Sequence, residues 1–189
     1  MSICNNNQTQ SYTLMKGGLM VLDSDLLETI YRQNYKSVYN YICFRINNHF
    51  DAEELASLVF EKAMRKWSSF DSSRPIEAWL IGIAKNTTTD YLRSKMRRSF
   101  VAWDNVIGLV SPNRQPEAIA VINESNRALI SAMAKLKKKE RQILSMKFAT
   151  ELKHSEIAEI LSISESNVAV IAHRALKKLR EYLDKENDL

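Results

Sequence analysis

The sequence predicts an all-α protein in which two small helical domains are joined by a flexible linker. Only 4 Gly and 3 Pro occur among 189 residues, so few positions interrupt a helix. Apolar residues recur at three- and four-residue spacing along most of the chain, and the alternation typical of strands is scarce. An irregular stretch at 99–116, which contains Pro112 and Pro116, divides the helical segments into two groups.

Composition narrows the functional classes. The chain is 45% hydrophobic and 26% charged, which is ordinary for a soluble protein. Its apolar runs are too short to cross a bilayer, and its N-terminus lacks the pattern of a signal peptide. Cys4 and Cys43 are far apart and the three histidines are scattered, which argues against zinc or a disulfide framework. We therefore expect a cytoplasmic protein with no metal, no cofactor and no membrane contact.

The N-terminal domain, residues 22–98, is expected to contain three helices. It follows residues 1–21, which are rich in Asn, Gln, Ser and Gly and are expected to be disordered. Asp51 is the expected cap of the second helix, and Pro75 suits the first turn of the third. The helices are expected at 24–47, from Asp51 to Trp67 and, after a polar loop at 68–75, from Pro75 to Arg98.

The C-terminal domain, residues 117–189, is expected to contain four helices, at 117–135, 137–149, 154–161 and 164–184. Ser155 and Ser164 are the expected caps of the last two, which a tight polar turn joins. The final helix has one apolar face, and its opposite face carries Ser166, Val170, His173, Arg174 and Lys177. This pattern is typical of a helix-turn-helix whose second helix enters the DNA major groove, although a solvated helical hairpin is the alternative.

Basic residues are concentrated in three clusters. The formal net charge is +5, and the clusters are the basic residues of 93–98, of 135–141 and of 174–180. A charge cluster alone often marks only a solvated surface. Beside a helix-turn-helix, however, such clusters favour contacts with DNA phosphates.

The second helix has a side that does not resemble core. With Leu55, Val59 and Ala63 turned inward, the helical period places Glu54, Ser57, Leu58, Glu61 and Arg65 on another face. A leucine among exposed acidic residues suggests a protein-binding patch. A single exposed leucine is also common and needs no explanation, so both interpretations stay open.

The third helix presents small, amide and basic residues away from its apolar face: Ala78, Gly82, Lys85, Asn86, Thr89 and Arg93. Such a face suits close approach of a nucleic-acid backbone or of bases. Gly82 lowers helix propensity by about 0.8–1 kcal/mol relative to alanine, a cost that close approach would explain. Trp79 lies at the margin of the core face, where it either packs or stacks on a base.

No pattern of enzyme chemistry is present in the sequence. It contains no glycine-rich phosphate loop, no nucleophile elbow and no cluster of metal ligands, so we expect no catalytic activity. Two other non-enzymatic classes remain open. One is a free-standing helix-turn-helix regulator, and the other is a module that binds only proteins.

Several motifs in order resemble one known family. They are Asp51-Ala-Glu-Glu-Leu-Ala-Ser-Leu-Val-Phe60, Ala78-Trp-Leu-Ile-Gly-Ile-Ala-Lys-Asn86, Asp90-Tyr-Leu-Arg93 and, in the helix-turn-helix, His173-Arg-Ala175. Together they are similar to bacterial RNA polymerase sigma factors of the sigma-70 family, extracytoplasmic-function class. The likeness covers about residues 24–184. It implies a polymerase-binding and promoter-melting domain 2 at 22–98, a linker at 99–116 and a DNA-reading domain 4 at 117–189.

The resemblance also implies partners and site residues. Domain 2 would grip the clamp helices of the largest subunit of core RNA polymerase through Asp51, Glu54, Leu55, Leu58, Val59, Phe60 and Glu61. It would hold the non-template strand of the minus-ten element, with a flipped base, through Ser72, Ser73, Arg74, Trp79, Lys85, Asn86, Thr89, Arg93 and Arg97. Domain 4 would contact the polymerase flap and read the duplex minus-thirty-five element through Ser155, Ser164, Ser166, Asn167, Val170, His173, Arg174, Lys177 and Lys178. An anti-sigma factor is a further candidate partner.

The chain departs from the family pattern at two places. Ser57 and Leu58 stand where the family usually has Gln followed by an acidic residue. Ala169 and Ile171 replace the usual Lys and Arg of the recognition helix, which removes candidate guanine contacts. Val170 is positioned to touch a thymine methyl group instead, so the preferred upstream sequence of the family does not transfer to this chain.

Overall fold

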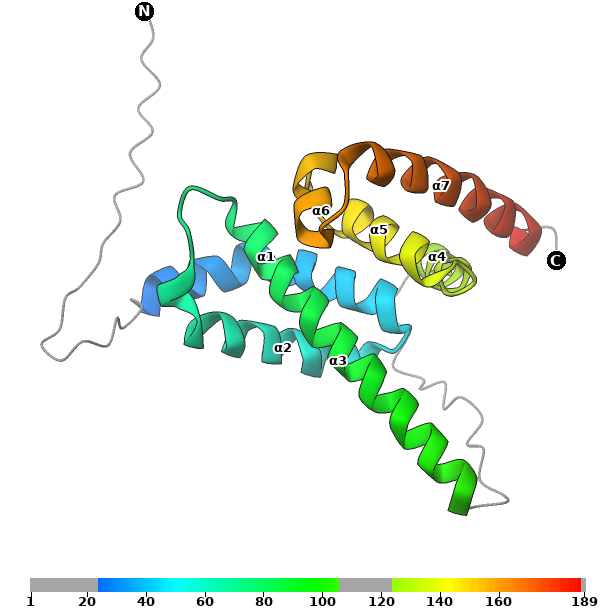
Figure 1. Cartoon of the computed structure of the whole chain (residues 1–189), viewed down its shortest axis with the longest axis horizontal. Coiled ribbons are helices and arrows are strands. Elements are labelled where there is room, and N and C mark those ends of the chain that lie inside the picture. The colour runs from blue at the N-terminus through cyan, green and yellow to red at the C-terminus, as the bar shows by residue number, and fades with distance from the viewer. Residues whose placement is uncertain (1–23, 106–123, 188–189) are drawn as a thin grey trace, which may run out of the picture.

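The structure, a computed structural model, describes residues 24–105 and 124–187, with side chains described for 25–98 and 128–184 (Figure 1). Within these ranges the chain forms seven α-helices and one short 3₁₀ turn, and it contains no strand. The expected disorder at 1–21 and most of the expected linker lie outside the described residues. None of the described helices is long and apolar enough to cross a membrane.

The N-terminal module consists of α1 (Ser24–Ile46), α2 (His49–Arg65), a 3₁₀ turn (Trp67–Ser69) and α3 (Ile76–Asn105). The three helices pack against one another in pairs. Their shared core contains the fully buried residues Val38, Ile42, Val59, Leu80 and Ile81. The apolar residues whose helical spacing predicted each helix are therefore the residues that fill this core.

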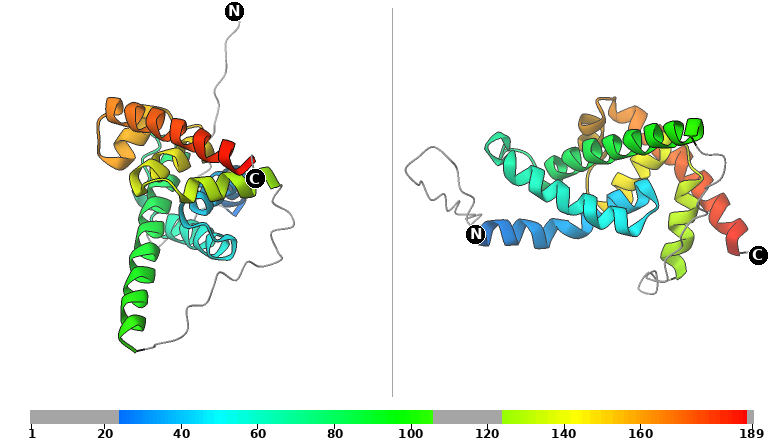
Figure 2. Two further views of the ribbon diagram at one scale, coloured as in Figure 1. Left: turned by 90° about the vertical axis from the view of Figure 1, so that its right-hand side faces the viewer. Right: turned by 90° about the horizontal axis from the view of Figure 1, so that it is seen from below.

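Two expectations for this module were wrong in detail. Asn48, not Asp51, caps α2, because the Asn48 side chain accepts a hydrogen bond from the Asp51 backbone N–H at 3.1 Å. Helix α3 continues seven residues beyond the expected end at Arg98, so its last two turns occupy the start of the predicted linker. No Gly or Pro occurs between Gly82 and Gly108, so nothing in the sequence breaks the part of α3 that projects from the body (Figures 1 and 2).

The C-terminal module consists of α4 (Glu124–Ala134), α5 (Lys138–Ala149), α6 (His154–Leu161) and α7 (Glu165–Asn187). Helix α7 packs against the other three. Buried Met133, Leu144, Ile157, Val168 and Leu179 form the core between them. Residues 117–123, expected as the start of α4, lie outside the described part.

The caps of the helix-turn-helix are partly as expected. The Ser164 hydroxyl accepts from the Asn167 N–H at 3.3 Å, which confirms Ser164 as the cap of α7. Ser155 is not a cap, because α6 begins earlier, at His154, and the Glu156 carboxylate accepts from the Lys153 N–H at 2.7 Å. Ser162 ends α6 in the left-handed region at φ 53°, which turns the chain into α7.

The two modules are packed together. Helix α1 lies along α5, where the rings of Phe44 and Phe148 meet edge to face with centroids 6.5 Å apart. Helix α6 contacts the N-terminal part of α3, and Figure 1 shows it beside the end of α3 nearest the loop. This arrangement brings the helix-turn-helix to the N-terminal module.

Candidate nucleic-acid and protein interfaces

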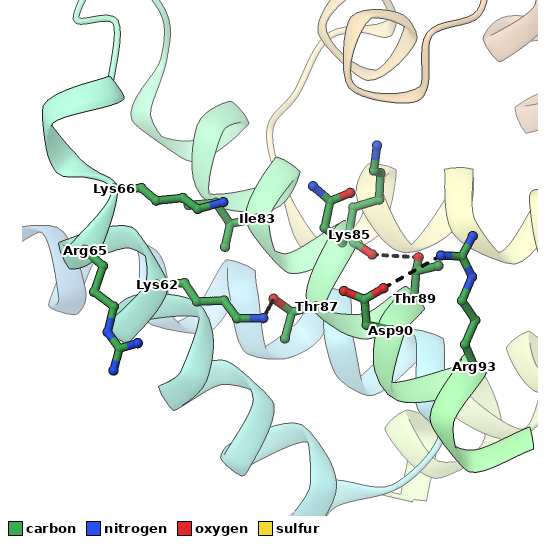
Figure 3. Close-up of a pocket in the computed structure, with 10 residues that line it drawn as sticks. Lys62, Arg65, Lys66, Ile83, Lys85, Thr87, Thr89, Asp90 and Arg93 are labelled. Carbon is green, nitrogen blue, oxygen red and sulfur yellow. Dashed lines mark hydrogen bonds and ion pairs between the residues drawn. The ribbon is translucent and has the colours of Figure 1, made fainter. Parts of the chain in front are cut away.

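A basic pocket opens between the C-terminal half of α2 and the middle of α3 (Figure 3). Its volume is about 680 Å³. Its lining is Lys62 and Arg65 from α2 and the C-cap residue Lys66, with Ile83, Lys85, Asn86, Thr87, Thr89, Asp90 and Arg93 from α3. Five Lys or Arg side chains and one carboxylate make the pocket a site for an anionic ligand such as a nucleic-acid backbone.

Contacts across and along the helices hold the pocket side chains. Lys62 Nζ donates to the Thr87 hydroxyl at 3.1 Å, which fixes one ammonium group between α2 and α3. Arg93 lies 3.8 Å from the carboxylate of Asp90 one turn earlier on α3. Arg65 pairs with Glu61 at 2.5 Å on the outer side of α2. The two ion pairs are exposed, so they orient Arg93 and Arg65 and leave them able to exchange partners.

Four residues predicted to bind the minus-ten strand, Lys85, Asn86, Thr89 and Arg93, line this one pocket. Sequence reasoning missed the three basic residues at the C-terminal end of α2, because it assigned that helix to protein binding alone. The signal was available, since Lys62, Arg65 and Lys66 follow the i, i+3, i+4 spacing of a single helix face.

The remaining predicted minus-ten residues lie outside the pocket. Ser72, Ser73 and Arg74 are exposed in the loop before α3, and Arg97 is exposed farther along α3. In the loop, the Ser73 N–H donates to the Asp71 carboxylate at 3.0 Å, and hydrogen bonds from Ser73 lower the pKa of Asp71. The loop therefore has defined local structure.

Trp79 is a packing residue in this structure. Its ring lies 5.0 Å from Phe70 and 5.9 Å from Trp67, centroid to centroid, in a three-ring cluster under the loop. Trp79 is half-buried among these rings, and its contact with a base stays a prediction.

Three residues predicted to bind polymerase are core residues. Leu55, Val59 and Phe60 are buried against α1 and α3, so they have no surface to offer a partner. They appeared in the prediction because the family motif was carried over as a continuous run, whereas only one side of a helix faces outward. Glu54 and Glu61 are exposed, and Leu58 is half-buried at the edge of the core. We call these three residues the acidic face of α2.

The exposed face of α7 is present as predicted. Ser166, Asn167, Val170, His173, Arg174 and Lys177 are all exposed, and Val170 is 46% exposed despite being apolar. Ser155 of α6 is also exposed. Lys178, predicted to meet phosphate, instead donates to the Glu140 carboxylate at 2.6 Å and ties α7 to α5. The face has the width and polarity of a helix that reads a major groove.

Both modules match known families. Residues 30–98 match Sigma-70 region 2, and residues 126–179 match Sigma-70, region 4. RNA polymerase sigma factor YlaC of Bacillus subtilis is 32% identical over 87% of this chain and 95% of its own length. ECF RNA polymerase sigma factor SigW of the same species is 31% identical over 79% and 84%. ECF RNA polymerase sigma factor BldN of Streptomyces coelicolor is 28% identical over 85% of this chain, which spans only 61% of that relative.

Solved structures agree at the level of the fold. The sigma factor RpoE in complex with the anti-sigma factor NepR from Bartonella quintana superposes with a TM-score of 0.68 at 19% identity, covering 83% of this chain and 96% of that one. CnrH in complex with the cytosolic domain of CnrY gives a TM-score of 0.59 at 19% identity, covering 86% and 90%.

Two sigma-70 regions, each a helical module and the second a helix-turn-helix, define a transcription protein that associates with polymerase and carries promoter specificity. The chain belongs to the RNA polymerase sigma factors of the sigma-70 family, extracytoplasmic-function class.

Proposed function

We propose that the two modules divide promoter recognition, with the N-terminal module holding the melted minus-ten strand and the C-terminal module reading the minus-thirty-five duplex. The observation that carries this proposal is the basic pocket between α2 and α3, which gathers residues from both helices. The exposed face of α7 supplies the second contact. The two contacts fall in the expected domains at 22–98 and 117–189.

In the minus-ten step, the basic residues of the pocket bind backbone phosphates, and Asn86 and Thr89 meet the bases. A single strand suits this pocket, because unstacked bases can leave the helix and expose their hydrogen-bonding edges. Arg93 and Arg97 extend the basic surface along the projecting part of α3. The exposed loop at Ser72 and Ser73 lies beside the same strand.

In the minus-thirty-five step, the N-terminal half of α7 enters the major groove. Ser166, Asn167 and Val170 face the bases, with His173 and Arg174 at the next turn. Lys177 contacts phosphate. Lys178 stays in its ion pair with Glu140, and Ser155 and Ser164 border the duplex at the N-terminal ends of α6 and α7.

The acidic face of α2 binds polymerase, and the C-terminal module makes a second contact with the flap region of polymerase. An acidic surface with one apolar residue complements a basic partner helix and excludes nucleic acid. The chain acts in the cytoplasm, where its polymerase resides. An anti-sigma factor that occupies the same surfaces would be its inhibitor, as the complexed state of RpoE and CnrH suggests by similarity. A free-standing regulator would leave the pocket without a role.

The test is in vitro run-off transcription with core RNA polymerase on a library of genomic promoter fragments. We expect the chain to start transcription at a defined set of promoters, and Asn86→Ala to reduce strand opening, measured by permanganate reactivity of thymines. Ser37→Ala, on α1 away from the pocket, is the matched control. Tight sequence-specific DNA binding by the chain alone, without any response to polymerase, would contradict the proposal.

A further inference from the structure

The joint between α1 and α5 contains two arginines, of which Arg45 is buried and Arg141 is half-buried. Arg45, in the last turn of α1, is 2% exposed, and its Nη1 donates to the backbone carbonyl of Lys138 at 3.3 Å. Arg141, one turn into α5, has a buried Nε and donates from Nη1 to the Ala134 carbonyl at 3.5 Å. Burial first, and the charge of Arg45 second, lower the pKa of Arg141, which places the two guanidinium groups within electrostatic reach of each other.

Neither guanidinium has a carboxylate partner among the described side chains. Glu140, the acidic residue next to Arg141, is already bound by Lys178 Nζ at 2.6 Å and by the Lys137 N–H at 3.1 Å. The described acidic residues of α1, Asp25 and Glu28, lie more than four turns from Arg45 on the same helix. The partners of the two cations are neutral backbone carbonyls, that of Lys138 in the first turn of α5 and that of Ala134 at the end of α4.

The Nε atoms of Arg45 and Arg141 are also buried without a hydrogen-bond partner among the described residues. Burial raises the pKa of the Tyr41 hydroxyl in the same joint, and its contacts with Arg45 and Gln142 oppose that rise. Unpaired buried charge and unmade hydrogen bonds both disfavour an interface relative to its separated, hydrated form. The joint is thus held by apolar contacts such as Phe44 with Phe148 and opposed by its own charges.

The same packing occupies part of the proposed DNA surface. Lys85 Nζ, in the basic pocket, donates to the Ile160 carbonyl of α6 at 3.0 Å. Arg74, in the loop before α3, pairs with Glu159 of α6 at 2.5 Å. While the modules are packed in this way, these two residues are not free to bind a DNA strand.

We propose that Arg45 and Arg141 act as an opening element, in which two like charges at the joint, without a carboxylate partner, keep the packed arrangement of the two modules weak enough for polymerase to separate them. The inference rests on the proposed function only for the identity of the opening partner. Removing either charge, or supplying the missing carboxylate, strengthens the packed form and makes it harder to open.

The experiment measures module separation in the full chain by fluorescence energy transfer while core RNA polymerase is titrated. Labels are placed at exposed Lys36→Cys on α1 and Glu181→Cys on α7, in a Cys4→Ser background, away from the pocket and from the acidic face. The apparent affinity for an opening partner falls in proportion to the open fraction of the free chain. A tenfold lower open fraction therefore raises the polymerase concentration at the midpoint about tenfold.

Three variants test the element from two directions. Arg45→Met and Arg141→Met each remove one charge, whereas Gln142→Glu adds a carboxylate beside the Tyr41 hydroxyl and keeps both arginines. We expect each to raise the midpoint about tenfold without lowering the thermal unfolding temperature. Arg32→Met is the matched control, because Arg32 is an exposed arginine of the same helix that pairs with Glu28 at 2.8 Å.

The outcomes separate the two proposals. If polymerase does not separate the labels in the parent chain at any concentration, the proposed function fails. If polymerase opens the parent chain but the midpoints of the folded variants equal that of Arg32→Met, or fall below it, the opening element is overturned. Should Arg45→Met and Arg141→Met fail to fold, Gln142→Glu decides alone.

Discussion

The phenolic hydroxyl of Tyr91 donates a hydrogen bond to the carboxylate of Asp51, and this contact joins the middle of α3 to the first turn of α2. Lys95, one turn beyond Tyr91, lies 3.8 Å from the same carboxylate oxygen and 3.2 Å from the phenolic oxygen. Asp51 was predicted to bind polymerase, but in this structure it is half-buried and engaged within the chain. Its role here is to fix the angle at which α2 presents its acidic face.

Tyr91→Phe should therefore destabilise the N-terminal module. Loss of a hydrogen bond to a charged acceptor costs about 1.5–3 kcal/mol, and partial exposure places this one near the lower figure. Urea unfolding followed by circular dichroism measures the change. Tyr31→Phe, at an exposed tyrosine of α1, is the control and should change stability by less than about 0.5 kcal/mol. Equal losses in both variants would show that the Asp51 contact contributes nothing.

The free energy of unfolding of the N-terminal module should also fall at alkaline pH. Burial raises the pKa of Tyr39 and of Tyr91, and for Tyr91 the hydrogen bond to Asp51 adds to the rise. A raised pKa in the folded state means that the unfolded chain loses its protons first, near pH 10. The contribution of these tyrosines to the free energy of unfolding is thus complete below that pH and is lost as the pH increases. Thermal unfolding between pH 8 and pH 11 should show this loss, and Tyr91→Phe should flatten the slope. A slope that Tyr91→Phe leaves unchanged would contradict the assignment.

Glu140→Gln should loosen the C-terminal module by about 1–2 kcal/mol at neutral pH, because it weakens two charge-assisted contacts, to Lys178 and to the Lys137 N–H. Burial alone would raise the pKa of Glu140, but the hydrogen bonds from Lys178 and Lys137 outweigh it, and the pKa is lowered. The contribution is therefore present above the ordinary carboxyl pKa and lost as pH falls below it. Chemical unfolding at pH 7 and pH 3 should show a difference only at pH 7, with Glu181→Gln as the exposed control.

Polymerase affinity should depend on the acidic face of α2. Glu54→Lys reverses an exposed charge and should weaken binding at least tenfold without changing thermal stability, since exposed substitutions alter stability by less than about 0.5 kcal/mol. Leu58→Glu is a poorer probe, because Leu58 packs against the core edge and its loss would also affect folding. Glu181→Lys makes the same charge change on α7 and should leave affinity unaltered. Similar affinities for both variants would rule out this face.

The recognition helix should separate into residues that read bases and residues that anchor. Asn167→Ala and Val170→Arg should change the preferred upstream sequence, because a good base contact is worth about 1–3 kcal/mol of discrimination. Lys177→Ala should weaken all promoters alike and reduce the salt dependence by about one unit. Selection from a randomised minus-thirty-five element, with each variant bound to polymerase, distinguishes these effects. The orientation of α7 would be wrong if Lys177→Ala changed the selected sequence and the other two variants did not.

Local pattern predicted most of the secondary structure. The apolar spacing located all seven helices of the described residues, and the Ser164 cap was correct because a cap depends on residues within one turn. The predicted caps Asp51 and Ser155 lie three and two residues beyond the observed caps Asn48 and Lys153. The extension of α3 was missed because residues 99–105 lack a steady apolar period, although no Gly or Pro interrupts them.

The sequence by itself determined the all-helical fold, the helix-turn-helix and the family, since each depends on spacing along a helix or on motifs in order. Only the tertiary structure decided which motif residues reach a surface, because burial depends on what neighbouring helices cover. It placed Leu55 and Phe60 in the core, brought Lys62 to the pocket of α3, and bound Lys178 to Glu140. The burial of Arg45 against α5 is likewise invisible in sequence, because its carbonyl partner, Lys138, lies 93 residues away along the chain.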